Sequence, residues 1–361
     1  MEEILRPDPI RGRGVSENLP NRFEKLHYET DLNSQVDPEE VAPLKTEFFK
    51  DPSRSIISYN NSPDVGFQAS INPYRGCEHG CAYCYARPFH EYLGFSSGLD
   101  FETKIFVKEE APKLLQKELS SPNWKSQVIV MSGVTDPYQP VERRLKMTRQ
   151  CLEVLVEFRN PVSIITKNAL ITRDIDLLAE LARHHAVGVF ISMTTLDEEL
   201  RRVMEPRTSS PARRIEAIER LSKEEIPVGV MVAPIIPGLN DHEIPAIVTA
   251  VARAGGRYAS HALVRLPHAV APLFERWLEQ HRPDRKEKVL NRIRSIQGGR
   301  LNNSEFGKRM EGEGIFARQI DSLFEIACHR AGIDGKGPSL SVASFRKLGG
   351  VQIPLFSKEE E

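Results

Sequence analysis

The chain has 361 residues, of which 40% are hydrophobic and 27% are charged, so it is long enough to bury a large core in one enlarged domain or two ordinary ones. Its 49 basic and 50 acidic residues give a formal net charge of -1, which excludes a bulk field that would hold the whole molecule to nucleic acid or to an anionic membrane. Any affinity for nucleic acid would therefore come from a local basic patch.

The start of the chain is acidic and has a proline at position 7, whereas a secretory signal needs a basic start followed by an apolar stretch. The longest apolar runs, at residues 186–193 and 227–237, are far shorter than the roughly 20 residues that a membrane-spanning helix needs. We therefore expect a cytoplasmic protein with no membrane segment.

Residues 1–65 are rich in Arg, Pro, Asn, Asp and Glu and show little apolar periodicity, which predicts an N-terminal extension that is partly disordered. Over residues 66–267, short apolar runs alternate with stretches of helical period. The runs predict buried parallel strands at residues 127–134, 162–166, 187–193, 228–235 and 261–266. The stretches between them predict crossover helices at residues 145–158, 173–184, 197–204, 211–224 and 241–254.

The repeated strand–helix unit predicts an α/β fold, and about six such units favour an open or partial barrel over a closed eight-stranded one. Asp174, Asp197 and Asp241 stand at helix N-cap positions, with Pro211 in a first helical turn. Residues 268–361 lose this rhythm and predict a helical C-terminal appendage. It has helices at residues 273–296 and 316–332 and an acidic tail at residues 349–361.

Three of the five cysteines fall within eight consecutive residues, at Cys77, Cys81 and Cys84. An odd number of clustered cysteines argues against a disulfide framework and favours thiolate ligands in a reducing compartment. Gly76 and Gly80 favour a loop over a regular helix at this point, because glycine supplies backbone angles that other residues resist. The spacing therefore allows three thiols from one loop to converge on one metal centre.

Thiolates select zinc or iron–sulfur centres, and three close ligands leave a fourth coordination position open. On spacing alone, a structural zinc site completed by His79 or by a distant histidine or cysteine stays an alternative. Cys151 and Cys328 stand apart on apolar helix faces, so we expect them in the core and expect no second cluster.

The pattern Cys-x3-Cys-x2-Cys, with Tyr83 just before the last cysteine, resembles the signature of the radical S-adenosylmethionine (SAM) superfamily. The resemblance covers about residues 67–267. It implies a partial (β/α)6 barrel of the TIM type, and a [4Fe-4S] cluster in which Cys77, Cys81 and Cys84 hold three irons and S-adenosylmethionine chelates the fourth. It also implies reductive cleavage of S-adenosylmethionine to a 5′-deoxyadenosyl radical that abstracts hydrogen. The electron would come from a donor such as flavodoxin or ferredoxin.

Ligand contacts are expected at the C-terminal ends of the strands. By resemblance, Thr135 and Asp136 hold the methionyl ammonium group, although Asp136 also suits an Asx-type turn before Pro137. Lys167 suits the methionine carboxylate as a point charge, with an ordinary surface lysine as the alternative.

Ser192 and Thr194 lie in a turn that resembles the Ser-Leu-Asp turn of the superfamily, which implies contact with the methionyl or ribose part. Glu205 and Arg207 suit ribose hydroxyls and a carboxylate, with a surface ion pair as the alternative. The apolar turn that begins at Ala233 resembles the one that packs against adenine.

The cysteine motif and the polar strand ends look closest to the spore photoproduct lyase and DNA repair photolyase-like branch, which makes nucleic acid a candidate substrate and partner. That lyase has a hydrogen-donating cysteine where this chain has Gly133, so another donor or another reaction is needed. A peptide or small-metabolite substrate, and a non-catalytic zinc or iron–sulfur binding module, stay alternatives.

One dense basic region suits phosphate binding, although interspersed acidic residues make it resemble an ordinary exposed helix. Its basic residues are Arg282, Arg285, Lys286, Lys288, Arg292, Arg294, Arg300, Lys308 and Arg309. The sequence does not indicate an oligomeric state.

Overall fold

The computed structural model describes residues 8–24, 44–333, 335 and 337–347. Its main sheet is parallel at every strand pair except the last, in which β2 runs antiparallel to β3. In spatial order the strands are β10 (Tyr258–Leu263), β9 (Val228–Ile235), β8 (Val187–Met193), β7 (Val162–Thr166), β6 (Ile129–Met131), β3 (Ala69–Ile71) and β2 (Ile57–Tyr59). The predicted α/β fold with a parallel sheet is confirmed.

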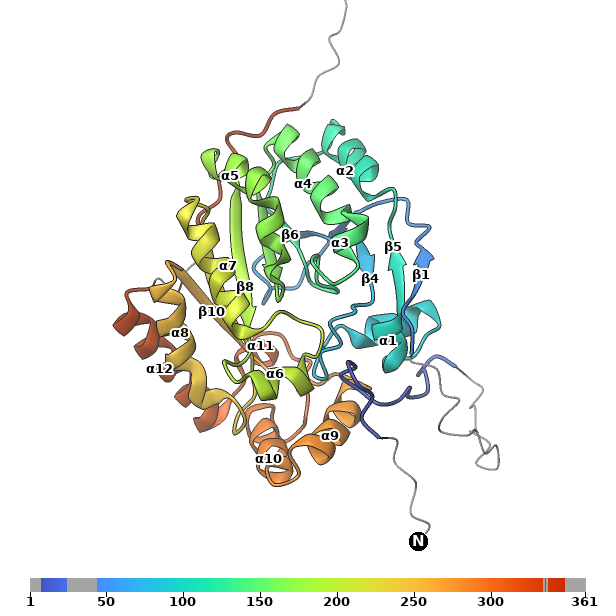
Figure 1. The fold of residues 1–361 in the computed structure, drawn as a ribbon, viewed down its shortest axis with the longest axis vertical. Helices are drawn as coiled ribbons and strands as arrows, with labels where there is room; N and C mark the ends of the chain where they lie inside the picture. Colours follow the sequence, from blue (N-terminus) through green and yellow to red (C-terminus); the bar gives the residue numbers. More distant parts are fainter. Residues whose placement is uncertain (1–7, 25–43, 334, 336, 348–361) are drawn as a thin grey trace, which may run out of the picture.

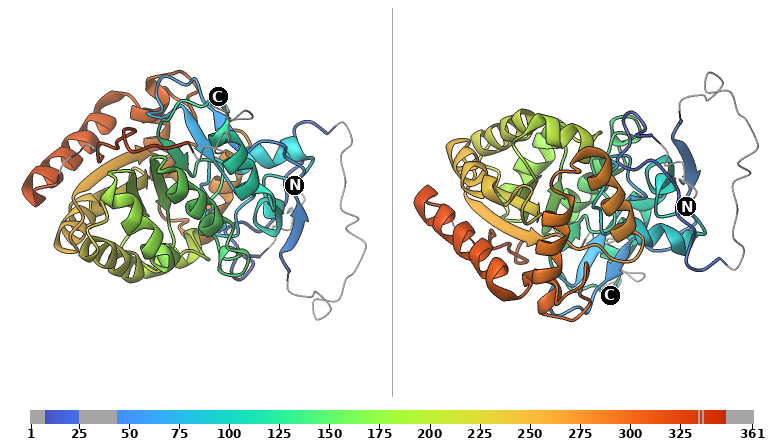
Figure 2. Two further views of the ribbon diagram at one scale, coloured as in Figure 1. Left: turned by 90° about the horizontal axis from the view of Figure 1, so that it is seen from above. Right: turned by 90° about the horizontal axis from the view of Figure 1, so that it is seen from below.

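Helices connect the parallel strands and lie along the outer side of the curved sheet (Figures 1 and 2). They are α4 (Met147–Phe158), α5 (Ile175–Arg183), α6 (Glu198–Met204), α7 (Pro211–Lys223) and α8 (Ile244–Arg253). Shorter pieces precede some of them, namely α3 (Glu142–Leu145), η3 (Ala169–Asp174) and η4 (Asp241–Glu243). Parallel strands covered by helices are buried on both faces, which agrees with the many valines and isoleucines of β7, β8 and β9.

A smaller sheet stands beside the main one, in the order β1 (Glu47–Lys50), β5 (Lys104–Val107) and β4 (Tyr74–Arg75) (Figure 1). The cysteine loop begins directly after β4 and ends at the 3-10 helix η2 (Arg87–Leu93). The helices α1 (Leu99–Thr103) and α2 (Ala111–Ser120) flank β5 in the sequence. The loop therefore follows a strand of this smaller sheet.

The C-terminal part is helical, as predicted, with α9 (Val270–His281), α10 (Lys286–Ile296), α11 (Lys308–Glu311) and α12 (Gly314–Ala331). The single stretch predicted at residues 273–296 is two helices, because Pro283 follows the end of α9. No helix among the described residues is long and apolar enough to span a membrane. The predicted acidic tail, and much of the predicted N-terminal extension, lie outside the described residues.

Two of the predicted helix starts are confirmed. The Asp197 side chain accepts hydrogen bonds from two backbone N–H groups of α6, and Pro211 opens α7 after the N-cap Ser210. Asp174 stands at the N-cap position of α5, as predicted, but its carboxylate pairs with Arg149 and Arg173 and accepts no capping hydrogen bond. The prediction for Asp241 is wrong, because Asp241 opens η4 and α8 begins at Ile244. The last strand lies at residues 258–263 and was predicted at 261–266.

A buried ion pair anchors the cysteine loop to α1. Arg87 and Glu102 have no exposed side-chain surface, and Arg87 Nη2 lies 2.5 Å from Glu102 Oε1. Arg87 also donates two hydrogen bonds to the carbonyl of Cys81, at 2.9 and 3.0 Å. Glu102 Oε2 accepts from the backbone N–H of Gly14 at 3.1 Å, so the pair joins the loop to both α1 and the N-terminal segment.

We predict that Arg87→Ala lowers the free energy of unfolding by about 3–5 kcal/mol, because it leaves the Glu102 carboxylate buried without its partner. Arg183→Ala is the matched control, since its pair with Glu180 is largely exposed and should contribute less than about 1 kcal/mol. Urea denaturation measures both. Similar losses for the two variants would contradict a supporting role for the buried pair.

Candidate functional site

Glycines shape the cysteine loop. Gly76 and Gly80 have positive φ angles of 77° and 65°, in the region that L side chains rarely adopt. A Cβ atom at residue 80 would lie 2.6 Å from Glu102 Oε2, and one at residue 76 would lie 3.0 Å from the carbonyl oxygen of Phe101. The loop therefore follows a path that only glycine permits at these two points, as the sequence predicted.

The thiols of the loop are buried or half-buried among apolar side chains. Cys77 and Cys84 pack around Phe101, and Cys84 also packs in the group that contains Cys81. Burial raises the pKa of Cys81, and raises that of Cys84 to about 11. Metal binding at these thiols would therefore release protons.

The donor chemistry of the loop fits an iron–sulfur cluster, since three cysteines lie close together in a site that is largely withdrawn from water. Among the described residues, no three Cys, His, Asp or Glu side chains form a ready-made metal site, so the fit is one of ligand type and not of ligand geometry.

Backbone hydrogen bonds tie the loop to its surroundings. The N–H of Cys77 donates to the carbonyl of Phe101 in α1 at 2.9 Å, and the N–H of Ala82 donates to that of Met204 in α6 at 3.0 Å. Thr135, in the turn after β6, donates from its hydroxyl to the carbonyl of Gly76 at 2.6 Å. Three separate elements thus hold the loop.

Asp136 also supports the loop, through His79. The carboxylate lies 3.3 Å from His79 Nδ1 and accepts from the Thr166 hydroxyl at 2.6 Å and from the Lys167 N–H at 2.8 Å. It also accepts from the N–H of Tyr138 at 2.8 Å, which is the Asx-type turn that the sequence allowed. These contacts occupy about all four lone-pair positions of the carboxylate. Contact of Thr135 or Asp136 with a ligand stays a prediction.

Opposite charges stabilise the contact between His79 and Asp136. Burial alone would disfavour both charged forms, but His79 lowers the pKa of Asp136, and Asp136 together with Cys77 raises the pKa of His79 to about 10. His79 Nε2 is 3.2 Å from the side-chain amide of Asn168. His79, between the first two cysteines, is therefore held by Asp136 and by Asn168, which directly follows β7 and Lys167.

Lys167 is the centre of a second network, at the C-terminal ends of β7, β8 and β9. Its Nζ lies within hydrogen-bonding distance of four oxygens, on Ser192 (3.0 Å), Thr194 (2.7 Å), Ala233 (2.9 Å) and Glu205 (2.9 Å). Five of the eight predicted cofactor-binding residues therefore meet at one ammonium group. The side chain of Lys167 is 14% exposed, whereas that of Glu205 is fully buried.

Glu205 is the carboxylate that the groups of this network share. Its side chain is fully buried and pairs with Lys167 on one oxygen and with Arg214 on the other, at 2.6 Å. Tyr83, from the cysteine loop, donates its hydroxyl to the same carboxylate. Burial alone would raise the pKa of Glu205, but Lys167 and Arg214 lower it well below its usual range. Two cations share one carboxylate here, which leaves an excess positive charge.

Arg207 does not join this network. It pairs with Glu78 of the cysteine loop at 3.0 Å, and its backbone N–H donates to the carbonyl of His79. The sequence allowed a surface ion pair between Glu205 and Arg207. Among the described residues, each of them pairs with other side chains instead. Ala233 contributes its carbonyl oxygen to Lys167, and the turn that follows it is held by Asn240.

Sequence reasoning missed Arg214 and the role of Tyr83 as a hydrogen-bond donor. Arg214 lies on the buried face of α7, with Pro211, Ala217, Ile218 and Leu221. A charged residue at an apolar position of a helix is the signal that could have identified it, because a buried charge needs a partner. Tyr83 was noted only as part of the cysteine motif.

The other predicted features are mostly structural. Cys151 and Cys328 are buried in the main apolar core, as expected. Gly133 has a positive φ of 117°, and its carbonyl accepts a hydrogen bond from the Tyr85 hydroxyl at 2.7 Å. In the basic region, Arg292 pairs with Asp241 and Arg309 with Asp64, which favours the interpretation as an ordinary surface.

A family model described as the radical SAM superfamily matches residues 71–251, half of the chain. An uncharacterized protein of Mycobacterium tuberculosis is 34% identical over 226 residues, which span 62% of this chain and 66% of that protein, just under two thirds of its length. An uncharacterized protein of Methanocaldococcus jannaschii is 31% identical over 55% of this chain and 71% of that protein.

A protein named radical SAM Nalpha-GlyT isomerase, from Pseudomonas phage M6, is 24% identical over 80% of this chain and 61% of that protein. Among solved structures, a spore photoproduct lyase mutant with bound AdoMet and dinucleoside spore photoproduct superposes with a TM-score of 0.57. That likeness covers 79% of this chain and 80% of the lyase, at 14% identity, so it shows a shared fold.

We predict that Glu205→Gln lowers the free energy of unfolding by about 3–5 kcal/mol, because it leaves two cations without their buried carboxylate. Glu198→Gln is the control, since Glu198 is 45% exposed in its pair with Arg201 and should cost less than about 1 kcal/mol.

Adding Arg214→Met to Glu205→Gln should recover part of the loss, which a double-mutant cycle by urea denaturation measures. Strictly additive losses would show that the two side chains are not coupled.

Proposed function

The chain belongs to the radical SAM superfamily, and on that premise we propose that it binds a [4Fe-4S] cluster through Cys77, Cys81 and Cys84 and uses it to cleave S-adenosylmethionine reductively. The observation that carries this proposal is the convergence of the strand ends on Lys167, beside the cysteine loop, with Tyr83 of the loop bonded to the same carboxylate.

The three cysteines would hold the cluster, and one iron would be left for the ligand. When bound, the cluster supplies one electron that breaks a carbon–sulfur bond of S-adenosylmethionine and yields a 5′-deoxyadenosyl radical for hydrogen abstraction. The chain itself fixes the loop through Arg87, Thr135 and His79, and its apolar side chains keep water from the thiols.

Lys167 is proposed to bind the carboxylate of S-adenosylmethionine. Its side chain is partly exposed, whereas those of Glu205 and Arg214 are fully buried, and the excess positive charge of these three groups suits an added carboxylate. Ser192 and Thr194 would orient the methionyl or ribose part, and the turn after Ala233 would pack against adenine. Arg207 lies outside this group and is proposed to position the cysteine loop through Glu78.

The curved sheet of this chain is proposed to be a partial (β/α)6 barrel, with residues 66–267 as the core domain, 1–65 as an extension and 268–361 as an appendage. The reaction needs an electron donor such as flavodoxin or ferredoxin. The thiol ligands suit a reducing compartment, so we place the protein in the cytoplasm.

Nucleic acid or a nucleotide is the proposed substrate class. Support comes from the fold shared with spore photoproduct lyase, which has been solved with a dinucleoside spore photoproduct, and from the resemblance of the polar strand ends to that branch. A peptide or small metabolite is the rival substrate class, and a zinc module is the rival for the metal site.

We predict that the anaerobically reconstituted and reduced protein converts S-adenosylmethionine to 5′-deoxyadenosine, detected by chromatography. Cys84→Ala should abolish the product, because the cluster loses a ligand. Lys167→Met should weaken binding of S-adenosylmethionine by about tenfold or more, the scale of one charge-assisted hydrogen bond. Product formation that survives Cys84→Ala would refute the ligand assignment.

We also predict that iron and sulfide are lost from Cys77→Ala, Cys81→Ala and Cys84→Ala but retained in Cys151→Ala and Cys328→Ala, which are buried in the core. Metal analysis and absorption spectra measure the content. Zinc without iron in the parent protein would overturn the radical chemistry and favour a metal-stabilised binding module.

A further inference from the structure

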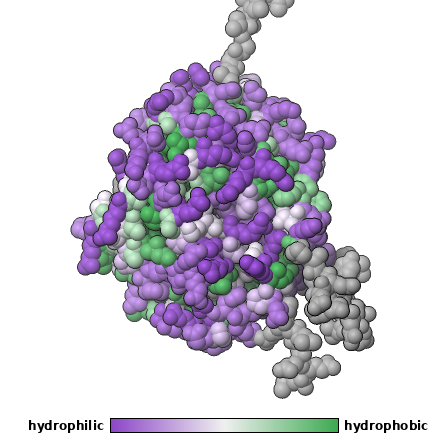
Figure 3. All heavy atoms as spheres, viewed as in Figure 1, coloured by the Kyte–Doolittle hydropathy of each residue, from purple (hydrophilic) through white to green (hydrophobic). Residues whose placement is uncertain are grey.

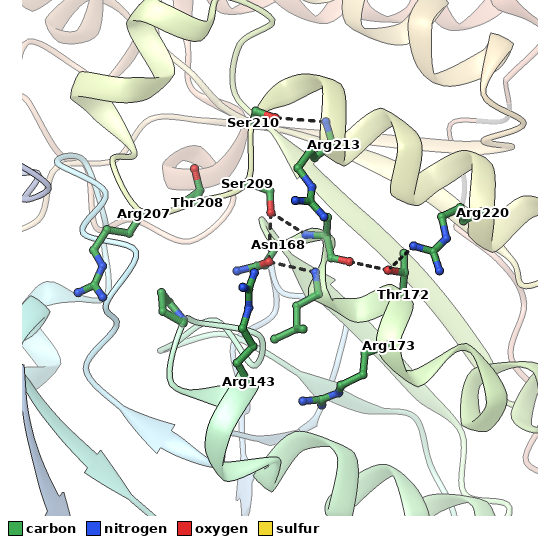
Figure 4. Close-up of a pocket in the computed structure, with 13 residues that line it drawn as sticks. Arg143, Asn168, Thr172, Arg173, Arg207, Thr208, Ser209, Ser210, Arg213 and Arg220 are labelled. Atoms are coloured by element: carbon green, nitrogen blue, oxygen red, sulfur yellow. Dashed lines mark hydrogen bonds between the residues drawn. The ribbon is translucent and has the colours of Figure 1, made fainter.

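A pocket of about 780 Å³ opens beside the turn that follows β7. Its walls come from the start of α3, from η3, and from the segment that leads into α7 (Figure 4). Figure 3 shows that hydrophilic side chains cover most of the molecular face seen in Figure 1, between scattered apolar patches. The pocket is lined by five arginines and by no acidic residue: Arg143, Arg173, Arg207, Arg213 and Arg220.

Two of these arginines are already neutralised. Arg173 pairs with Glu142 and Asp174, and Arg207 pairs with Glu78. Their guanidinium groups help to shape the pocket and contribute little free charge.

The other three have no acidic partner among the described residues. Arg143 and Arg213 have exposed side chains, and Figure 4 shows both extending toward the space beside Asn168. Arg220 donates to the Thr172 hydroxyl at 3.2 Å, which leaves its charge uncompensated. Glu219, next to Arg220 in α7, pairs with Lys223. The pocket therefore carries a net positive charge in a molecule whose overall charge is close to zero.

The remaining polar groups of the pocket also suit an anion. Ser209 and Ser210 line it where α7, a helix of 13 residues, begins. The positive dipole end of α7 reinforces the attraction of the arginines for negative charge. Its N–H groups contribute little, because Pro211 has none and Ser210 accepts from that of Arg213.

The pocket shares a wall with the cysteine loop. Asn168 lines the pocket and bonds to His79, which stands between Cys77 and Cys81. Asn168 also accepts from the Ser209 hydroxyl at 3.1 Å. A group bound among the arginines would thus lie next to the proposed reaction centre, on the far side of Asn168.

The spacing of the free arginines suits more than one anionic group. Arg213 and Arg220 are seven residues apart on α7, which is about 10 Å along the axis at a rise of about 1.5 Å per residue. Together with Arg143 on α3, they spread positive charge over more surface than one phosphate occupies. Arginine forks match phosphate oxygens, and a row of such contacts is typical of a strand backbone.

We propose that Arg143, Arg213 and Arg220 bind successive phosphates of a single nucleic-acid strand and hold it against the site at Lys167. The inference rests on the proposed nucleic-acid substrate and names the surface that would bind it. It replaces the basic region at residues 282–309, whose arginines are mostly paired with acidic residues, as the phosphate-binding surface.

The test is binding of a short fluorescently labelled single-stranded DNA to the full-length protein, measured by anisotropy over a range of salt concentrations. The double variant Arg143→Gln and Arg213→Gln should bind at least about tenfold more weakly, and the slope of log affinity against log salt should fall by about 1.4 for two lost phosphate contacts. Both side chains are exposed, so circular dichroism should show the parent fold.

The matched control is Lys288→Gln with Arg300→Gln, which removes two exposed charges from the basic region and should leave binding unchanged. Equal weakening by the two double variants, or unchanged binding by the pocket variant, would overturn the proposal. So would failure of the parent protein to bind the strand.

A deoxynucleoside monophosphate added as competitor separates a strand from a free nucleotide. We expect it to compete at least about tenfold less well than unlabelled strand, since it makes one phosphate contact. Equal competition by the monophosphate and the unlabelled strand would contradict the proposal that the ligand is a strand. Binding is measured without S-adenosylmethionine, so failure of its cleavage would refute the proposed reaction and leave this result intact.

Discussion

One buried carboxylate holds the proposed reaction centre together. Glu205 lies between Lys167 and Arg214 without access to water, and it also accepts from Tyr83 of the cysteine loop. A buried charge is stable only when it is paired and hydrogen-bonded, so this carboxylate requires β7, α7 and the loop to stay in one arrangement. The arrangement of the strand ends around Lys167 thus depends on a carboxylate that is itself fully buried.

The cysteine loop depends on similar contacts on its other side. Arg87 and Glu102 form a second buried pair, and the loop carbonyls accept bonds from Arg87 and from Thr135. His79 connects the loop to Asp136 and Asn168. Because the loop is fixed by buried polar contacts, its thiols are directed by the protein and not by the metal alone. Asn168 then links this loop to the arginine pocket.

Sequence patterns predicted β7, β8 and β9 to the residue, because covered parallel strands are continuous apolar runs. They also placed Lys167, Ser192 and Thr194 at the C-terminal ends of strands, and these residues meet because neighbouring parallel strands end at one edge. The partners of Glu205 could not be read in the same way, because Arg214 comes from the next helix and Arg207 is nearer in the chain. The pocket arginines come from four separate segments, so no local pattern marks them.

The most direct test of this account is the electron paramagnetic resonance spectrum of the reduced, iron-loaded protein before and after S-adenosylmethionine is added. The account predicts a cluster signal that changes on addition, because the ligand binds the iron that has no cysteine, and predicts that Cys81→Ala loses the signal. A spectrum that S-adenosylmethionine leaves unchanged, or a signal that survives the loss of Cys81, would contradict it.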